Sequence, residues 1–253
     1  VEYVSLYWDG RNGYVNVGHL PELDNTVEFT ISMWMLQDVF GKVFLFYSGS
    51  SAPDPRVSIM LSGSLLLTID NGYGEIADCT SYLPVGKWHH IAMVYDGSGS
   101  GNDQRLKLYL NGVQIPLTFT GTIPETTSDM TGTSALVGVA TASWYGALRD
   151  VRVYNAALSD ANVQTLASEG TYTTGMVHQW LFNDGTGSTA ADTGSNPING
   201  TLSPSLVESG WRQVGTPVRA VSFYRVISEE RPHGNSKFKV VQARRCYHAG
   251  AVS

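Results

Sequence analysis

Alternating apolar and polar positions recur along the chain and predict a succession of short β-strands. The segment 29–35 (FTISMWM) alternates strictly, with one apolar face, as a half-buried strand does. Further apolar runs of strand length lie at 43–47, 57–61, 65–69, 89–95, 106–110, 113–115, 135–139, 146–154 and 177–182. Roughly ten strands without alternating helices exclude an α/β fold and leave a β-sandwich or a β-barrel.

The breaks between these runs predict specific turns and one helix. The three residues of 62–64 (SGS) separate two runs by a good hairpin length. Asn111-Gly112 is a strong signal for a type I′ turn. Ser159 can cap a short helix over 160–167 that Gly170 ends.

Composition agrees with a single large all-β domain. Of the 253 residues, 42% are hydrophobic and 15% charged, which is enough apolar material for a core and too few charges for a disordered chain. No apolar run approaches the ~18 residues of a membrane span. The first residues (VEYVSLYWDG) predict no secretion signal, and Val1 in place of Met leaves open that one was removed.

Charge divides the chain into an acidic body and a basic arm. The net charge is −6; from Trp211 onward there are 8 basic and 2 acidic residues, which leaves 8 basic and 20 acidic residues before it. We expect the arm to dock on a partner protein or a second copy of the chain, and the acidic body to oppose nucleic acid. The predicted partner-binding residues are Arg219, Arg225, Arg231, Lys237, Lys239, Arg244 and Arg245.

The chain has two cysteines, Cys79 and Cys246. Neither stands in a CxxC or Cys/His spacing typical of a metal site. Two buried or free thiols and a bridge that ties the arm to the body are both compatible with the sequence.

Four motifs carry a family resemblance. Residues 86–96 (GKWHHIAMVYD) and 108–112 (LYLNG) follow the pattern G-x-W-H-H-[IV]-A-x-[VT]-[YW]-D … [LI]-Y-[VLI]-N-G, and 6–15 and 144–159 (WYGALRDVRVYNAALS) add two more motifs. In this order they resemble the laminin-G-like, concanavalin A-like lectin/glucanase family. The resemblance implies a two-sheet antiparallel jelly-roll sandwich, here with one short helix and a C-terminal extension.

One motif stands out of the family's order. Residues 177–202 resemble the family's first strand and loop but come last in this chain. We interpret 176–210 as closing the domain in the manner of a circular permutation; the alternative is the start of a second, truncated repeat. The expected domains are therefore a jelly roll over 1–210 and the basic arm over 211–253.

The resemblance also implies a structural calcium ion. Asp9 and Asp150 match the positions that supply carboxylates to it in lectin-like jelly rolls, and Ca²⁺ takes 6–8 oxygen ligands. The alternative is that both are turn aspartates bonded to local backbone N–H groups.

Aromatic residues near loops are candidates for stacking on a sugar. Tyr73, Trp144 and Tyr145 are the predicted ligand-binding residues, although packing at the rim is an alternative for each. Trp34, Trp88 and Trp180 lie within apolar strands, so they are expected in the core.

Catalysis is not expected. Glu75 and Asp78 have the wrong spacing for the paired carboxylates of a glycoside hydrolase on one strand face. His89 and His90 fit strand positions, one pointing inward and one outward, and no nucleophile elbow occurs.

We therefore expect a non-catalytic carbohydrate-binding or adhesion module, located extracellularly or on a virion surface, with a glycan or a protein surface as its partner. The alternative is a structural assembly protein, a virus-particle decoration or fibre subunit, that forms a homo-oligomer through its basic arm. Fold alone does not decide between them.

Overall fold

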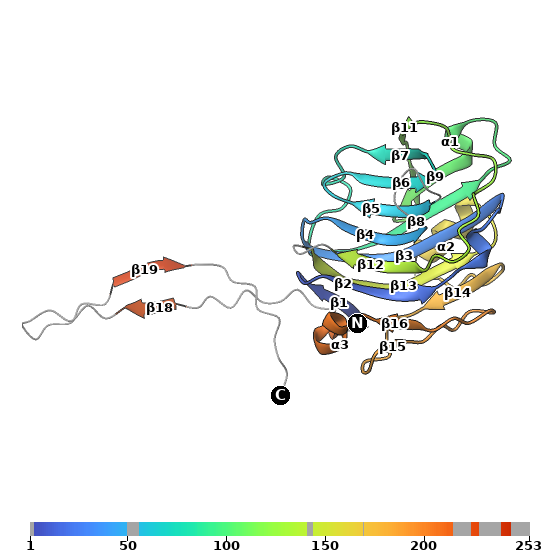
Figure 1. Cartoon of the computed structure of the whole chain (residues 1–253). Helices are drawn as coiled ribbons and strands as arrows, with labels where there is room; N and C mark the ends of the chain where they lie inside the picture. Colours follow the sequence, from blue (N-terminus) through green and yellow to red (C-terminus); the bar gives the residue numbers. More distant parts are fainter. Residues whose placement is uncertain are drawn as a thin grey trace, which may run out of the picture. The chain divides into compact units, whose positions relative to one another are not determined.

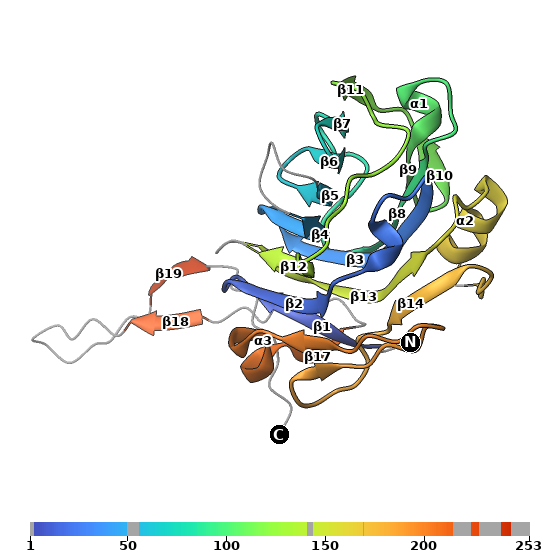
Figure 2. The ribbon, with the colours of Figure 1, turned by 45° about the vertical axis from the view of Figure 1, so that its right-hand side comes forward.

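The computed structural model describes residues 3–49, 56–140, 144–168, 170–214, 224–227 and 239–243. Within Glu2–Val214 it forms one compact unit, and Gly215–Ser253 belong to a second. The first unit is an antiparallel β-sandwich of two stacked sheets, visible as two layers in Figures 1 and 2. The fold class expected from the sequence is confirmed.

Sheet A contains eight strands. Its order is β10-β9-β8-β3-β13-β1-β17, and β14 pairs with β13 beyond the end of β1. The strands are β1 (Tyr3–Asp9), β3 (Glu28–Val39), β8 (Trp88–Asp96), β9 (Leu106–Leu110), β10 (Val113–Ile115), β13 (Tyr145–Tyr154), β14 (Met176–Trp180) and β17 (Trp211–Val214).

Sheet B contains nine strands in the order β11-β7-β6-β5-β4-β12-β2-β16-β15. They are β2 (Gly13–Gly18), β4 (Val43–Gly49), β5 (Arg56–Leu61), β6 (Leu65–Ile69), β7 (Gly72–Ile76), β11 (Thr118–Thr120), β12 (Ala135–Ala140), β15 (Thr189–Ala190) and β16 (Gly200–Leu202). In the second unit, β18 (Tyr224–Ile227) pairs with β19 (Lys239–Ala243).

The core fills the space between the two sheets because side chains alternate along each strand. On β3, Phe29, Ile31, Met33 and Met35 all point inward and are completely buried. The outer face of sheet A, the face turned away from sheet B, therefore carries the even-numbered residues of β3. One end of this face is covered by α2 (Asp160–Ala167), whose Val163 and Leu166 pack in a second apolar cluster with residues of β8 and β9.

The predicted turns are confirmed. Leu61 pairs with Leu65 across the three-residue loop, and Asn111 and Gly112 have φ angles of 51° and 80°, as a type I′ turn requires. Ser159 caps α2, since its hydroxyl accepts a hydrogen bond from the backbone N–H of Asn162.

The structure contains more helical segments than the one predicted from the sequence. The structure adds α1 (Asn102–Arg105), α3 (Pro204–Ser209) and the 3₁₀ turn η1 (Pro21–Leu23). These segments have three to six residues, too few for a helical apolar period to be seen in the sequence. No helix in the described residues has the length and apolar character needed to cross a bilayer.

The C-terminal part of the sandwich completes both sheets. The strand β14 pairs with β13, β16 pairs with β2, and β17 pairs with β1 through Leu6 and Trp211. The compact unit therefore extends to Val214, four residues beyond the boundary expected at 210, because the ladder with β1 includes the residues after Gly210.

A buried ion-pair network holds the closing segment, residues 176–210, to the rest of the sandwich. His178 of β14 is completely buried; its Nδ1 lies 2.7 Å from Asp192 Oδ2 and its Nε2 lies 3.2 Å from Glu22 Oε2. Burial opposes the charged ring, but the bonds to both carboxylates outweigh it and raise the pKa of His178. Cys79 is a buried free thiol whose Sγ donates to the carbonyl of Gly63, while Cys246 lies outside the described residues.

Candidate functional site

Asp9 and Asp150, the predicted calcium ligands, do not lie at one site. Asp9 pairs with Tyr145 in the β1–β13 ladder, so Asp150 is five residues further along β13, roughly 16 Å away at ~3.3 Å per residue. The Asp150 carboxylate accepts from Arg152 Nε and Nη2 at 2.7 Å each and from Gln179 Nε2 at 2.8 Å. Asp9 lies 3.6 Å from Arg11 and 3.8 Å from Arg212.

This pair does not fit a calcium ion. Ca²⁺ needs six to eight oxygens at about 2.3–2.6 Å, and both oxygens of Asp150 are already bound to a guanidinium. In the part of the chain that the structure describes, no group of three or more His, Cys, Asp or Glu residues is placed to hold a metal. The structure does not bring Asp9 and Asp150 to one site, because strand register, which the motifs do not encode, separates them. Calcium binding by this chain stays a prediction.

The three predicted ligand-binding aromatics are also separated. Trp144 is completely buried, with its ring 5.6 Å from that of Trp8, so the expectation of an exposed ring at this position was wrong. Tyr145 is 40% exposed and its ring covers Gly10 at the end of sheet A. Tyr73 is half-buried on β7 of sheet B, beside Thr68 and Thr120.

The predicted partner-binding residues cannot be placed. Arg219, Arg231, Lys237, Arg244 and Arg245 lie outside the described residues, as do the side chains of Arg225 in β18 and Lys239 in β19. Docking through the arm stays a prediction.

Sequence reasoning missed an aromatic and guanidinium patch on the outer face of sheet A. Trp34 and Trp88 were expected in the core, but both lie outside the core cluster and are partly exposed, whereas Trp180 is buried as expected. On β3, alternation places Trp34 with Thr30 and Ser32, opposite to the buried Met33 and Met35. The strict alternation of 29–35 was therefore the signal that could have identified it.

Arg149 of β13 joins the two tryptophans. The carbon at the centre of its guanidinium lies 4.8 Å from the centroid of the Trp34 ring and 4.9 Å from that of Trp88. The arrangement follows from strand pairing, because Arg149 is opposite Trp34, and Trp88 is opposite Leu36 on the same face. We call Trp34, Trp88 and Arg149 the tryptophan–arginine patch.

His90 forms the floor beside this patch. Its ring meets that of Trp34 edge-on at 5.4 Å, and its side chain is 2% exposed. Its Nδ1 is buried and has no hydrogen-bond partner among the described residues. Burial lowers the pKa of His90 to about 4, so the ring is neutral at physiological pH. His89 points the other way, with Nε2 3.0 Å from the carbonyl of Pro84, which confirms the predicted alternation of the two histidines.

Polar groups surround the patch on the neighbouring strands. Tyr7 Oη donates to Asp38 at 2.9 Å, and the Arg212 guanidinium lies 4.4 Å from the centroid of the Tyr7 ring. On the other side are Asp150 and Arg152, which are held together as described above. The outer face of sheet A thus combines aromatic surface with hydrogen-bond donors and acceptors whose positions are fixed by their neighbours.

Comparison with known proteins gives one family and several structures. The model of the concanavalin A-like lectin/glucanases superfamily matches residues 9–164. A candidate carbohydrate-binding protein from Bacteroides ovatus is similar in structure, with a TM-score of 0.59, 15% identity, and 85% of this chain and 61% of that chain covered. This chain thus spans less than two thirds of that protein. No curated protein sequence matches.

Two further structures show weaker similarity. The CBM40 of a Ruminococcus gnavus IT-sialidase, bound to α2,3-sialyllactose, has a TM-score of 0.46 at 14% identity, with 65% of this chain and 97% of that chain covered. A heptameric SAP-like pentraxin from Limulus polyphemus has a TM-score of 0.42 at 19% identity, with 63% and 83% covered. At these identities, the structural similarities concern the fold only.

Proposed function

This chain belongs to the concanavalin A-like lectin/glucanase superfamily, and we propose that it is a non-catalytic carbohydrate-binding module that holds its glycan on the tryptophan–arginine patch. The candidate carbohydrate-binding protein from Bacteroides ovatus, which shares the fold, supports the general function. The site itself is inferred from the residues of this chain, because a fold does not specify a binding site. We expect the module to act outside the cell, as a secreted or surface protein.

The observation that carries this proposal is the position of Arg149 between two partly exposed tryptophans on one face of a sheet. A pyranose ring has an apolar face of C–H groups that stacks on an indole, and hydroxyl groups at its edge that accept hydrogen bonds from a guanidinium. Neither Trp34 nor Trp88 belongs to the core cluster, so packing of the core does not explain these two side chains. Ring contacts hold Arg149 in place, so less side-chain entropy is lost when a ligand binds.

Neighbouring groups supply the remaining polar contacts. Asp38 accepts a hydrogen bond from Tyr7, and Asp38 is exposed to solvent, so its second oxygen can accept from a sugar hydroxyl. On the far side of the patch, the Gln179 side chain donates to Asp150 at 2.8 Å and accepts from the Thr193 hydroxyl at 3.1 Å, so both ends of its amide are engaged. The acceptor available to a sugar hydroxyl therefore lies on the Asp38 side of the aromatic centre.

The carboxylates on this face favour binding without catalysis. A glycoside hydrolase needs two carboxyl groups on opposite sides of the scissile bond, one of them able to carry a proton. Both oxygens of Asp150 accept from Arg152, so this carboxylate is engaged by a guanidinium on the same strand. Asp78, which is close to Glu75 in the sequence, is exposed and accepts a hydrogen bond from the Thr80 hydroxyl at 2.6 Å.

A glycan array tests the proposal directly. The wild-type protein, Trp34→Ala, Trp88→Ala and the control Tyr14→Ala, which removes an exposed ring from β2 of the other sheet, would be applied to the same array. We expect the wild type and the control to bind the same glycans and both tryptophan variants to lose that binding. Unchanged binding by both tryptophan variants would exclude the patch as the site.

The second candidate function is a subunit of a larger assembly, such as a virus-particle decoration or fibre protein. It is supported by the separate C-terminal unit, Gly215–Ser253, which contains its own two-stranded sheet and seven of the sixteen Lys and Arg residues. Light scattering after gel filtration tests it: a defined oligomer that dissociates when these seven residues become Gln supports assembly. A monomer in both forms argues against it.

A further inference from the structure

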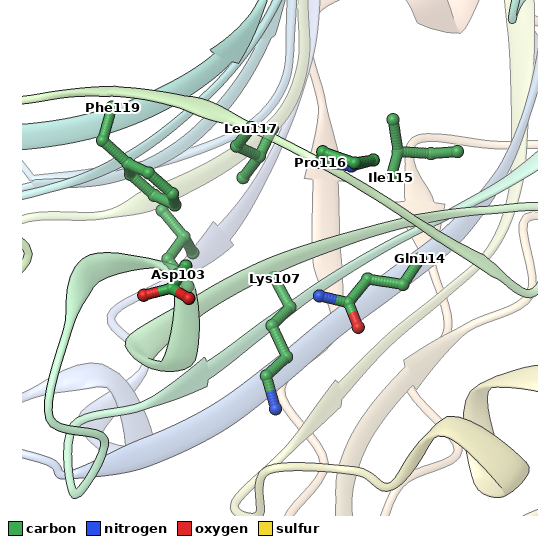
Figure 3. A pocket seen from close by; sticks show the side chains of 8 residues that line it. Asp103, Lys107, Gln114, Ile115, Pro116, Leu117 and Phe119 are labelled. Carbon is green, nitrogen blue, oxygen red and sulfur yellow. The ribbon is translucent and has the colours of Figure 1, made fainter.

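A pocket lies where the chain crosses from sheet A to sheet B, at the edge of each sheet, and its lining includes no residue of the tryptophan–arginine patch. It encloses about 350 Å³ between α1 and the edge strands β9, β10 and β11 (Figure 3). Its lining residues are Asp103, Leu106, Lys107, Gln114, Ile115, Pro116, Leu117 and Phe119. This volume is at the lower end of the ~300–1,000 Å³ typical of small-molecule sites, so it suits a ligand of about one ring.

Three polar side chains of different character line this pocket. Asp103 presents a carboxylate, Lys107 an ammonium group and Gln114 an amide, and Figure 3 shows Lys107 and Gln114 side by side with Asp103 near Phe119. Within the described part of the chain, none of the three makes a side-chain hydrogen bond or an ion pair. Their hydrogen-bonding capacity is therefore available to a ligand, unlike that of Asp150 or Arg152 on the sheet face.

The aromatic wall of the pocket is fixed in position. The ring of Phe119 on β11 lies over Gly74 of β7, where an added Cβ would come within 2.8 Å of Phe119 Cε1 and of Leu117 Cδ1. Both side chains are half-buried and pack against the core. Because Gly74 has no side chain, the Phe119 ring can pack against the backbone of β7 while it lines the pocket.

The loop that carries Asp103 is also preorganised. Asn102 donates to the carbonyl of Gly121 and accepts from the backbone N–H of Ile123, both at 2.9 Å. Arg105 donates to the carbonyls of Gly99 and Ile123 at 2.7 and 2.9 Å. These bonds tie α1 to the segment after β11, so the acidic and the aromatic sides of the pocket are held at a constant separation.

We propose that this pocket binds a single neutral sugar ring, as a second glycan contact independent of the tryptophan–arginine patch. The charges of Asp103 and Lys107 are opposite, which gives no net preference for an anionic or a cationic ligand. Asp103 accepts from hydroxyls, Lys107 donates to them, and Gln114 does both. Phe119, with Leu117 and Pro116, offers an apolar surface to the C–H face of the ring. Two contacts in one module raise the apparent affinity for a branched or repeating glycan.

Amide NMR tests this proposal in one titration, because the two sites have separate reporters. The full-length ¹⁵N-labelled protein would be titrated with glucose, galactose, mannose, N-acetylglucosamine and fucose. Gln114 contributes a side-chain amide signal at the pocket, and Trp34 and Trp88 contribute indole signals at the patch. We expect at least one sugar to shift the Gln114 signal in a saturable manner.

Variants then assign the interaction. We expect Lys107→Ala and Asp103→Asn each to weaken the Gln114-reported binding about tenfold or more, and Phe119→Ala to weaken it similarly, with unchanged spectra elsewhere. Val113→Ala is the control, since Val113 is 62% exposed on the same strand as Gln114 and does not line the pocket.

The outcomes separate the two sites. A Gln114 shift without any indole shift supports the pocket and counts against the patch. Indole shifts without a saturable Gln114 shift for any of the five sugars overturn the pocket and leave the patch standing. Gln114-reported binding that survives both Lys107→Ala and Asp103→Asn also overturns it.

Discussion

The guanidinium of Arg149 lies 4.8 Å from the ring centroid of Trp34, on the side of sheet A that faces away from the core. Trp88 is at 4.9 Å from the same group, and His90 closes the cluster from below. Arg149, Trp34 and Trp88 come from β13, β3 and β8, respectively, which are three adjacent strands of the sheet. A cluster of this kind on an outer face contributes little to the sandwich core and places aromatic surface where a ligand can reach it.

Replacement of Arg149 by Lys separates charge from planarity. A lysine keeps the positive charge but cannot stack a planar group between two indoles. We expect Arg149→Lys to lower the free energy of unfolding by about 1 kcal/mol, in the range of a partly exposed cation–π contact, and to weaken glycan binding. Urea unfolding and calorimetric titration measure the two effects. Equal stability and equal affinity in the variant would show that the stacked geometry has no consequence.

Trp144 and Trp34 should respond in opposite ways. Trp144 is completely buried against Trp8, so Trp144→Ala is expected to cost about 3–5 kcal/mol of stability. Trp34→Ala should cost much less, because part of its ring is exposed, yet it should abolish glycan binding. Urea unfolding of both variants, with binding measured on the folded protein, makes the comparison. If Trp144→Ala remained stable but lost binding, its ring would be a ligand contact after all.

We expect the contribution of His178 to the stability of the sandwich to decrease as the pH rises. Its pKa is raised by Asp192 and Glu22 against the effect of burial, so its contribution is complete below about pH 6.5 and is lost as the pH rises through the raised value. His178→Asn should remove this decline. The decrease is measured as the free energy of unfolding in urea at several pH values from about pH 6 upward. If the free energy of unfolding of the wild type changed with pH in parallel with that of the variant, the assignment to His178 would be contradicted.

The partners of His178 act at the other end of the pH range. Burial opposes the ionised form of Asp192, but His178 and three backbone N–H groups outweigh it and lower its pKa, and the pKa of Glu22 is lowered in a similar way. Their contribution is therefore present above about pH 4 and lost on further acidification. The closing segment should be held most firmly between about pH 4 and pH 6.5.

His90 has the opposite effect to His178. Burial lowers its pKa to about 4, while the unfolded chain binds the proton at about 6.5, so acidification favours the unfolded state between these values by about 3 kcal/mol. We expect His90→Gln to reduce the loss of stability between about pH 7 and pH 4.5 by about 2–3 kcal/mol. Urea unfolding at both pH values measures it, and an acid-induced loss as large in the variant as in the wild type would refute the assignment.

Much of the fold could be predicted from local pattern. Hairpins and caps depend on a few adjacent residues, so the loop between Leu61 and Leu65, the turn at Asn111-Gly112 and the cap at Ser159 were found. The short helices α1 and α3 escaped because six residues or fewer show no period.

The binding residues were harder to predict from the sequence, because their positions depend on which strands are neighbours in the sheet. Asp9 and Asp150 carried a family motif, but the ladder of β1 and β13 separates them. Trp144 resembled a loop aromatic, yet it turns inward against Trp8. Trp34 could have been placed correctly, because its parity with Thr30 and Ser32 was visible. Its approach to Arg149 could not, because that contact joins residues more than a hundred positions apart.

The indole N–H signals of the six tryptophans, followed while the best glycan from the array is titrated into the protein, give the most direct test of the central claim. We predict that the signals of Trp34 and Trp88 shift together and saturate with one dissociation constant, while those of the buried Trp8, Trp144 and Trp180 stay in place. Saturable binding that leaves the Trp34 and Trp88 signals unmoved would contradict the proposal that the outer face of sheet A holds the glycan.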